Sequence, residues 1–249
     1  MKSNYIKSKV EGSLMKSTFK KSYTKFLLPL IILSSSAGVM ARTKAMIVPS
    51  ERKPQTESHS GHRFHLDPKI FKGNSVNFIE YQGPGAFDNY LSMNLPFEPM
   101  ADLFKQLLIK ERRPLTNRGE AHITVITPVE FWNELKPFGV TMQEINQIAL
   151  DAKIQNSAFQ IACLGRGEAS VDGKLEQTFF VVIKSENLLA IRKRVQQLLM
   201  TKANGQPTTF AADKFYSHIT LGFTKRDLHE SDGVIKNENS CVGSLSVRK

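Results

Sequence analysis

Two short segments of the chain alternate apolar and polar residues, and both contain the sequence His-Ile-Thr: residues 121–126 (AHITVI) and residues 217–222 (SHITLG). A period of two with β-branched residues predicts a strand in each segment. Because successive side chains of a strand point to opposite faces, each segment can bury its Ile in a core and present an imidazole and a hydroxyl on the other face. The residues on that polar face are His122, Thr124, His218 and Thr220.

Elsewhere the pattern predicts three helices and three further strands. Apolar residues at spacings of three and four favour helices that begin near Pro99, after a capping box of Thr141 and Glu144, and near Glu186. On the last helix, Arg192 is expected to point mostly outward. The predicted helices cover residues 99–113, 142–153 and 186–202, and the predicted strands cover residues 76–81, 159–164 and 178–184, with a hairpin turn at Asp172-Gly173.

Each half of the chain therefore has the order strand, helix, His strand. We interpret this order as a diverged duplication, and we predict an α+β fold of two lobes. Each lobe would be an antiparallel sheet backed by helices, and the lobes would face each other across a central cleft. The folded unit is expected at residues 76–230, and the polar residues that dominate from Asp227 onward predict a polar tail at residues 231–249.

The first 41 residues have the pattern of a secretory signal. Lysines precede an apolar run at residues 26–33, and small residues with Val39 and Ala41 follow it. This pattern predicts cleavage after Ala41 and export to the periplasm or the medium. The run is too short to cross a bilayer, which takes about 20 residues, so we expect no membrane span after processing. A mitochondrial transit peptide and an uncleaved anchor are less favoured alternatives, and translation could begin at Met1 or at Met15.

Residues 42–75 contain several Pro and Ser residues and little periodicity, which predicts a linker. His59, His62 and His65 recur at three-residue intervals within it. A metal site would need this spacing on a helix or tight loop together with a further ligand, and the neighbouring Ser and Gly residues do not predict a helix. A solvated segment is therefore favoured, and we expect neither a metal nor a cofactor.

Cysteine and charge content change this picture little. The only two cysteines, Cys163 and Cys241, could pair in an exported protein, but one lies in a predicted strand and the other in the predicted tail, so the sequence leaves their pairing open. The formal net charge is +11, but seven of the 34 basic and one of the 23 acidic residues precede Arg42, which leaves +5 for the rest. Mild basicity is compatible with an anionic substrate and is equally common in proteins that bind none.

Two His-x-Thr-x motifs, roughly a hundred residues apart and each in a predicted strand, resemble the signature of the two-histidine (2H) phosphoesterase superfamily. The resemblance covers about residues 76–226 and extends to the Swiss Army Knife RNA-repair-like branch of that superfamily. It implies the same two-lobed fold, with both His strands lining the cleft. It also implies a metal-independent cyclic phosphodiesterase whose partner is a nucleotide or RNA end that carries a 2′,3′-cyclic phosphate.

Two imidazoles suit this chemistry because phosphodiester hydrolysis moves one proton off the attacking water and another onto the departing oxygen. A His side chain titrates near pH 6.5, so one imidazole can be neutral while the other is charged. We expect His122 and His218 to be this pair, with the two roles unassigned, and Thr124 and Thr220 to hold the non-bridging phosphate oxygens. Four nearby residues could contact phosphate or stack on a base, or could be ordinary surface or core: Arg166, Lys214, Tyr216 and Phe223.

Two other functions compete with this one. The first is a catalytically silent exported module that binds nucleotide or RNA in the same cleft, and the second is an envelope interaction protein with a vestigial cleft. Intact His and Thr residues in both motifs favour the enzyme, since a pure binder could use Lys or Arg instead. Export fits poorly with repair of intracellular RNA, so the physiological substrate could be foreign RNA or a small cyclic nucleotide. We expect the protein to act as a monomer.

Overall fold

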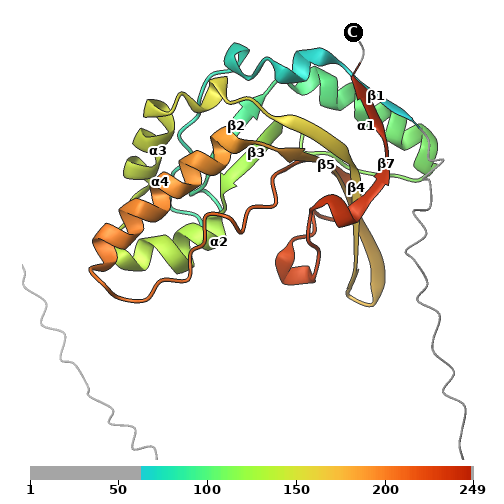
Figure 1. Ribbon diagram of the computed structural model, residues 1–249. Helices are drawn as coiled ribbons and strands as arrows, with labels where there is room; N and C mark the ends of the chain where they lie inside the picture. Colours follow the sequence, from blue (N-terminus) through green and yellow to red (C-terminus); the bar gives the residue numbers. More distant parts are fainter. Residues whose placement is uncertain (1–62, 248–249) are drawn as a thin grey trace, which may run out of the picture. The chain divides into compact units, whose positions relative to one another are not determined.

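The computed structural model of the protein describes residues 63–247. The main element is a six-stranded antiparallel sheet with the strand order β2-β3-β6-β5-β4-β7 (Figure 1). The predicted signal peptide with its cleavage site, both candidate start residues, His59 and His62 lie outside the described residues. The strands of the sheet are β2 (Leu91–Leu95), β3 (Ala121–Ile126), β4 (Gln160–Val171), β5 (Lys174–Lys184), β6 (His218–Phe223) and β7 (Cys241–Gly243).

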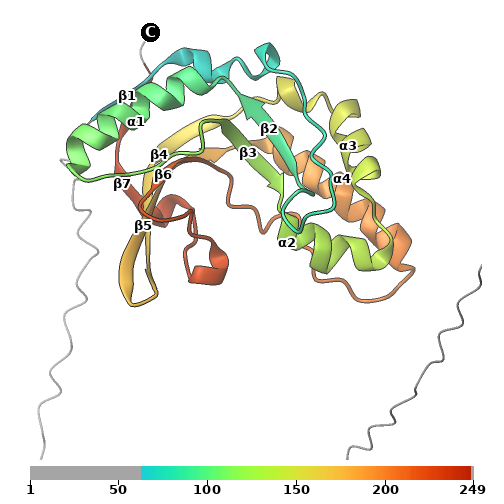
Figure 2. The same cartoon turned by 180° about the vertical axis from the view of Figure 1, so that it is seen from behind.

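Helices pack on one face of this sheet. Their buried residues, such as Leu103, Ile145 and Ile191, form one core cluster with strand residues such as Ile123 and Ile219. Figures 1 and 2 place α1 at the β7 end of the sheet, and α3 and α4 together at the β2 and β3 end. The helices are α1 (Phe97–Glu111), α2 (Pro128–Glu130), which continues through a π-helical turn (Phe131–Leu135) and a 3-10 turn (Lys136–Phe138), α3 (Met142–Asp151) and α4 (Glu186–Ala203).

All three predicted helices and the predicted hairpin are confirmed. α3 begins after the capping box of Thr141 and Glu144, in which each residue's side chain accepts a hydrogen bond from the other's backbone N–H. α1 ends at Arg112, which adopts a left-handed backbone conformation with φ of 50°. Asp172 and Gly173 both have positive φ between β4 and β5, as a tight hairpin turn requires. The hairpin strands extend beyond their predicted bounds, to 12 and 11 residues.

The first strand of the sheet does not lie where the sequence predicts it. Residues 76–80 form no strand, and Tyr81 makes only an isolated bridge to Tyr90. The sheet begins instead with β2, in which Ser92 and Asn94 alternate with apolar residues and every residue is buried. Asn is a poor strand former, so the segment looks like a loop. Its burial depends on hydrogen bonds that the sequence does not reveal, since Asn94 accepts from the hydroxyls of Tyr81 and Ser92.

The α+β class and the antiparallel sheet are confirmed, but the two His strands do not belong to separate sheets that face each other. β3 and β6 are neighbours in one sheet and pair at Ile123 and Ile219. In each half, the strand before the helix pairs antiparallel with the His strand, β2 with β3 and β5 with β6. A duplication would leave such a shared connectivity, and the duplication itself stays an interpretation.

The residues after Asp227 differ from the expected polar tail. β7 extends the sheet beside β4, and a disulfide joins Cys163 to Cys241 across these two strands. β8 (Leu245–Val247) pairs in parallel with β1 (Phe64–Leu66), part of the expected linker, as a second small sheet near the C-terminus (Figure 1). The remaining short 3-10 helices are Pro68–Phe71, Gly73–Ser75, Ile154–Asn156, Glu230–Asp232 and Glu238–Ser240.

Candidate active site

The two His-Ile-Thr segments lie side by side and share one face of the sheet. β3 and β6 run antiparallel, with their two buried isoleucines opposite each other. The same register sets His122 opposite Thr220 and Thr124 opposite His218, on the face away from the helices. Side chains paired in this way lie about 5 Å apart at their Cβ atoms. The four predicted catalytic residues therefore form one patch, and all four are half-buried.

His218 is held in one tautomer. Its Nδ1 lies 2.7 Å from the carbonyl oxygen of Tyr216, and because a carbonyl only accepts, Nδ1 carries the proton. Nε2 is therefore unprotonated and has a free lone pair. The Nε2 atom lies 3.3 Å from Nζ of Lys236. The ring of Phe180 meets the imidazole edge-on at 5.8 Å between centroids. Burial, together with the nearby Lys236 ammonium group, lowers the pKa of His218 to about 3.

His122 has a different neighbour. Its Nδ1 lies 3.5 Å from Oε1 of Glu120 and forms no hydrogen bond within residues 63–247. The ring of Tyr90 lies 6.0 Å away between centroids and stacks in turn on Tyr81. Burial lowers the pKa of His122 below its ordinary value, while the Glu120 carboxylate opposes this shift and the Arg118 guanidinium adds to it. The two imidazoles thus differ in the sign of the nearest charge, a carboxylate for one and an ammonium group for the other.

Asp227 lies at the centre of a polar cluster beside the second motif. Its Oδ1 accepts hydrogen bonds from Thr178 at 2.6 Å and Lys236 at 2.7 Å, and its Oδ2 accepts from Thr220 at 3.0 Å and Arg118 at 3.1 Å. Burial alone would raise the pKa of Asp227, but the Lys236 ammonium group, with a smaller contribution from the Thr178 hydroxyl, holds it well below its ordinary value. The hydroxyl proton of Thr220 faces this carboxylate, so Thr220 must turn its hydroxyl to donate to a phosphate.

A buried arginine on α4, Arg192, holds the loop that precedes the second motif. Arg192, which we expected to point outward from α4, is only 2% exposed. The guanidinium of Arg192 lies over the ring of Phe215, 5.1 Å from the centroid. It joins β3 and the turn after β3 to the loop that leads into β6. Its hydrogen-bond acceptors are the carboxylate of Glu130 and the backbone carbonyls of Val125, Ala211, Ala212 and Lys214.

Two of the predicted substrate-binding residues lie away from the patch. Arg166 pairs in register with Phe179 on the adjacent strand and so shares the core face of the sheet, opposite the histidines. Its guanidinium contacts Glu168 at 3.1 Å. Lys214 is exposed and contacts Glu230 at 3.4 Å. Neither side chain contacts the four motif residues in this structure.

The other two predicted residues lie closer. The backbone carbonyl of Tyr216 accepts the hydrogen bond from Nδ1 of His218. This contact involves the main chain, so the choice of tyrosine at this position does not predict it. Phe223 pairs in register with Thr178, whose hydroxyl reaches Asp227. Phe223 therefore shares the face of the sheet that carries the imidazoles.

Several residues of the site were missed by the sequence analysis. Arg118 and Glu120 precede the first motif by four residues or fewer, so their proximity to His122 was a usable signal. Asp227 and Lys236 follow the second motif within a polar segment and are 6% and 4% exposed, and nothing in that composition marks them as buried. Among residues 63–247, no group of three or more His, Cys, Asp or Glu residues could hold a metal ion.

Comparison with known families places these residues in a recognised domain. The model of the Swiss Army Knife, 2H phosphoesterase domain matches residues 89–229, more than half of the chain. The matched segment begins just before β2 and includes both His-Ile-Thr motifs and Asp227, but not Lys236. No curated protein and no solved structure matches the chain.

Proposed function

Because the chain belongs to the Swiss Army Knife family of 2H phosphoesterases, we propose that it hydrolyses 2′,3′-cyclic phosphates on RNA ends or small nucleotides. The family implies a phosphoesterase in general terms, and the narrower substrate class is our proposal. The observation that carries it is the patch on β3 and β6, where two imidazoles and two threonine hydroxyls share one face of the sheet that the helices leave uncovered. A cyclic phosphate suits such a patch because its strained ring already fixes the direction of attack.

The neighbours of the two imidazoles favour one assignment of roles. The Lys236 ammonium group favours neutral His218, and the proton on Nδ1 leaves the lone pair of Nε2 to accept a proton. The Glu120 carboxylate favours the charged form of His122. We therefore infer that His218 is the general base and His122 the general acid. An anionic phosphate beside His122 would further raise the pKa of that imidazole.

The reaction then moves two protons in opposite directions. Nε2 of His218 removes a proton from water as the water oxygen bonds to phosphorus. The bond from phosphorus to one ribose oxygen breaks, and that oxygen takes the proton of the His122 imidazolium. The product is a phosphomonoester with a free ribose hydroxyl. A second proton exchange with solvent restores both imidazoles.

Two further groups fit the phosphate itself. The Thr124 hydroxyl forms no side-chain hydrogen bond within residues 63–247, so its proton is available to a non-bridging oxygen. The Arg118 side chain is 38% exposed and is held by Asp227, which leaves part of its planar fork of donors open to an anion. We infer that both groups stabilise charge on the phosphate as it reacts.

The test is incubation of the mature protein, residues 42–249, with a panel of 2′,3′-cyclic nucleotides and RNA ends, with products identified by phosphorus NMR. We expect conversion of the cyclic phosphate signal to a phosphomonoester signal. Binding without turnover would favour the silent binding module, and neither binding nor turnover across the panel would contradict the proposed function.

We also propose that the protein is exported after cleavage near Ala41. The disulfide between Cys163 and Cys241 supports this, because such bonds persist mainly in oxidising compartments. In the part of the chain that the structure describes, no helix is long and apolar enough to cross a membrane. N-terminal sequencing of protein from the envelope fraction of its host should give Arg42 as the first residue, and full-length protein in the cytoplasm would contradict export.

A further inference from the structure

A buried lysine lies in the site although the family match ends before it. Lys236 belongs to the segment after β6, and the match stops at residue 229. Its Nζ lies 3.3 Å from Nε2 of His218 and 2.7 Å from Oδ1 of Asp227, above the ring of Phe180 at 5.5 Å. Lysine is almost never this deeply buried without a specific partner. The geometry places an ammonium group at the imidazole atom that would take a proton from the attacking water.

Lys236 has more hydrogen-bond donors than it has partners in the described protein. Asp227 supplies one negative charge, and both Lys236 and Arg118 donate to it. An ammonium group has three N–H donors, and those of Lys236 have two partners, Asp227 and His218, within residues 63–247. One N–H donor of Lys236 is therefore left over in a partly water-excluded site, which suits an anion.

We propose that Lys236 binds the phosphate of the substrate directly. While Nε2 of His218 accepts from the attacking water, a phosphate oxygen beside that water can lie at hydrogen-bond distance from Nζ of Lys236, because Nζ is only 3.3 Å from Nε2. Asp227 holds the ammonium group in place, and the Cys163–Cys241 disulfide anchors the segment that carries it. The proposal rests on the proposed function for its ligand class, a phosphoester bound at His218.

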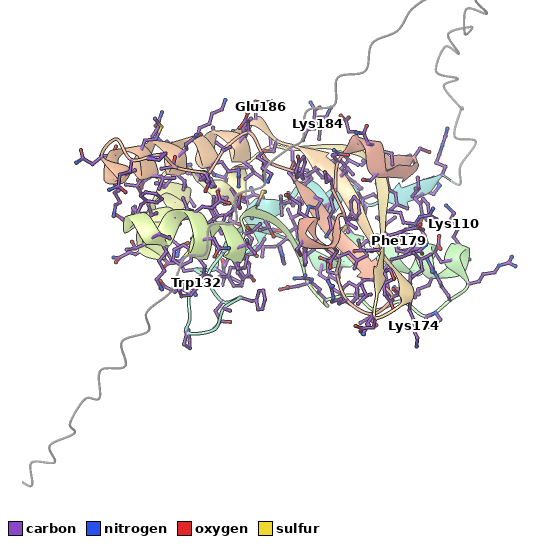
Figure 3. All side chains as sticks on the ribbon, turned by 90° about the horizontal axis from the view of Figure 1, so that it is seen from below. Lys110, Trp132, Lys174, Phe179, Lys184 and Glu186 are labelled. Carbon is purple, nitrogen blue, oxygen red and sulfur yellow. A yellow bond between two sulfur atoms is a disulfide. The ribbon has the colours of Figure 1, made fainter. Side chains whose placement is uncertain are left out.

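A purely structural role is the alternative. In that case Lys236 only fastens the C-terminal segment to the sheet through Asp227. Lys184 provides a matched control, since its Nζ contacts Glu238 of the same segment at 2.8 Å. It lies at the far end of β5 from the hairpin residue Lys174 (Figure 3), and its side chain is 60% exposed. Loss of Lys184 weakens the same attachment without removing charge from the site.

The experiment is calorimetric titration of inorganic phosphate into the wild type, Lys236→Met and Lys184→Met. Lys236→Met should raise the dissociation constant for phosphate at least about tenfold, because the variant loses a charge-assisted hydrogen bond to the anion. Lys184→Met should bind as the wild type does. Wild-type affinity in Lys236→Met, or equal weakening in both variants, would overturn the proposal.

A second measurement needs no variant, in case Lys236→Met does not fold. In wild-type protein labelled with ¹⁵N-lysine, the ammonium signal of Lys236 should shift as phosphate saturates the site, and that of Lys184 should not. An unshifted Lys236 signal at saturation overturns the inference even if cyclic nucleotides are hydrolysed. A shifted signal without any hydrolysis upholds the phosphate contact and contradicts only the proposed reaction. Absence of phosphate binding contradicts the inference about Lys236, and the panel of cyclic phosphates then decides the proposed function separately.

Discussion

The imidazole of His122 lies beside the carboxylate of Glu120, with 3.5 Å between Nδ1 and Oε1. This carboxylate opposes the effect of burial, which lowers the pKa of His122. If His122 is the acid, it must be protonated, so activity falls as pH rises through its pKa. Burial lowers the pKa of both site histidines, so we expect the optimum of kcat/KM on the acid side of pH 6.5, the ordinary value for His.

Glu120→Gln should move the alkaline limb of this profile to lower pH. Removal of the carboxylate takes away the group that most favours the imidazolium form of His122, ahead of Asp227, so the acid loses its proton at lower pH. The measurement is kcat/KM from about pH 4 to pH 9, with Glu98→Gln as the control because Glu98 is 84% exposed on α1. If the alkaline limb of the kcat/KM profile stays at the same pH or moves to higher pH, Glu120 does not support the charged form of the acid.

The two imidazoles should act as a unit. His122→Ala and His218→Ala should each lower turnover by about 10²–10⁴-fold, because each removes one proton transfer. The double variant should be little worse than either single variant. His65→Ala is the control, since the imidazole of His65 contacts Ser246 in the small sheet of β1 and β8. Near-wild-type turnover in either single variant of the pair would be incompatible with paired acid–base catalysis.

Turnover should survive a metal chelator. The patch on β3 and β6 offers one imidazole per strand. Of the nearby carboxylates, Glu120 lies beside His122, and Asp227 is already held by four protein donors, so the described residues do not surround an open metal position. Activity should be unchanged by EDTA, and also by deletion of residues 42–62, which carry His59 and His62. The deletion must stop there, because Phe64 and Leu66 of β1 are fully buried. Loss of activity in EDTA with recovery on addition of zinc or manganese would disprove the mechanism.

Replacement of Arg192 should destabilise the fold. Arg192→Met leaves the Glu130 carboxylate and four backbone carbonyls without their donor, and breaking such a buried pair costs about 3–5 kcal/mol. Urea unfolding measures the change in the free energy of unfolding. Arg194→Met, at an exposed position on the same helix, should cost less than about 0.5 kcal/mol. Equal stability of the two variants would mean that Arg192 does not fasten β3 to the loop that leads into β6.

Local patterns in the sequence were sufficient for much of this structure. The alternation around His122 and His218 gives both His strands, and the capping box of Thr141 and Glu144 gives the start of α3 within one residue. Such features depend on neighbours within a few residues, so they survive without knowledge of the fold. The family match agrees with the resemblance that the two motifs carry.

Long-range burial of polar groups was not predictable. Arg192 is buried by carbonyls that lie up to 67 residues away, and Asn94 is buried in β2 partly because Tyr81 donates to it. Lys236 and Asp227 meet within a segment whose composition is that of a solvated tail. In each case the polar side chain is buried because a partner distant in sequence, or on another loop, satisfies it. Sequence periodicity contains no information about such partners.

The parallel pairing of β1 with β8 brings the two ends of the described chain together. The N–H of Phe64 donates to the carbonyl of Ser244 at 3.0 Å, and His65 lies opposite Ser246. Three residues of strand span about 10 Å, so a linker of a few residues could connect residue 247 to residue 63. A circular permutant closed in this way could open at Asp172-Gly173, the exposed hairpin tip. Its new ends would then project from the hairpin, away from the small sheet.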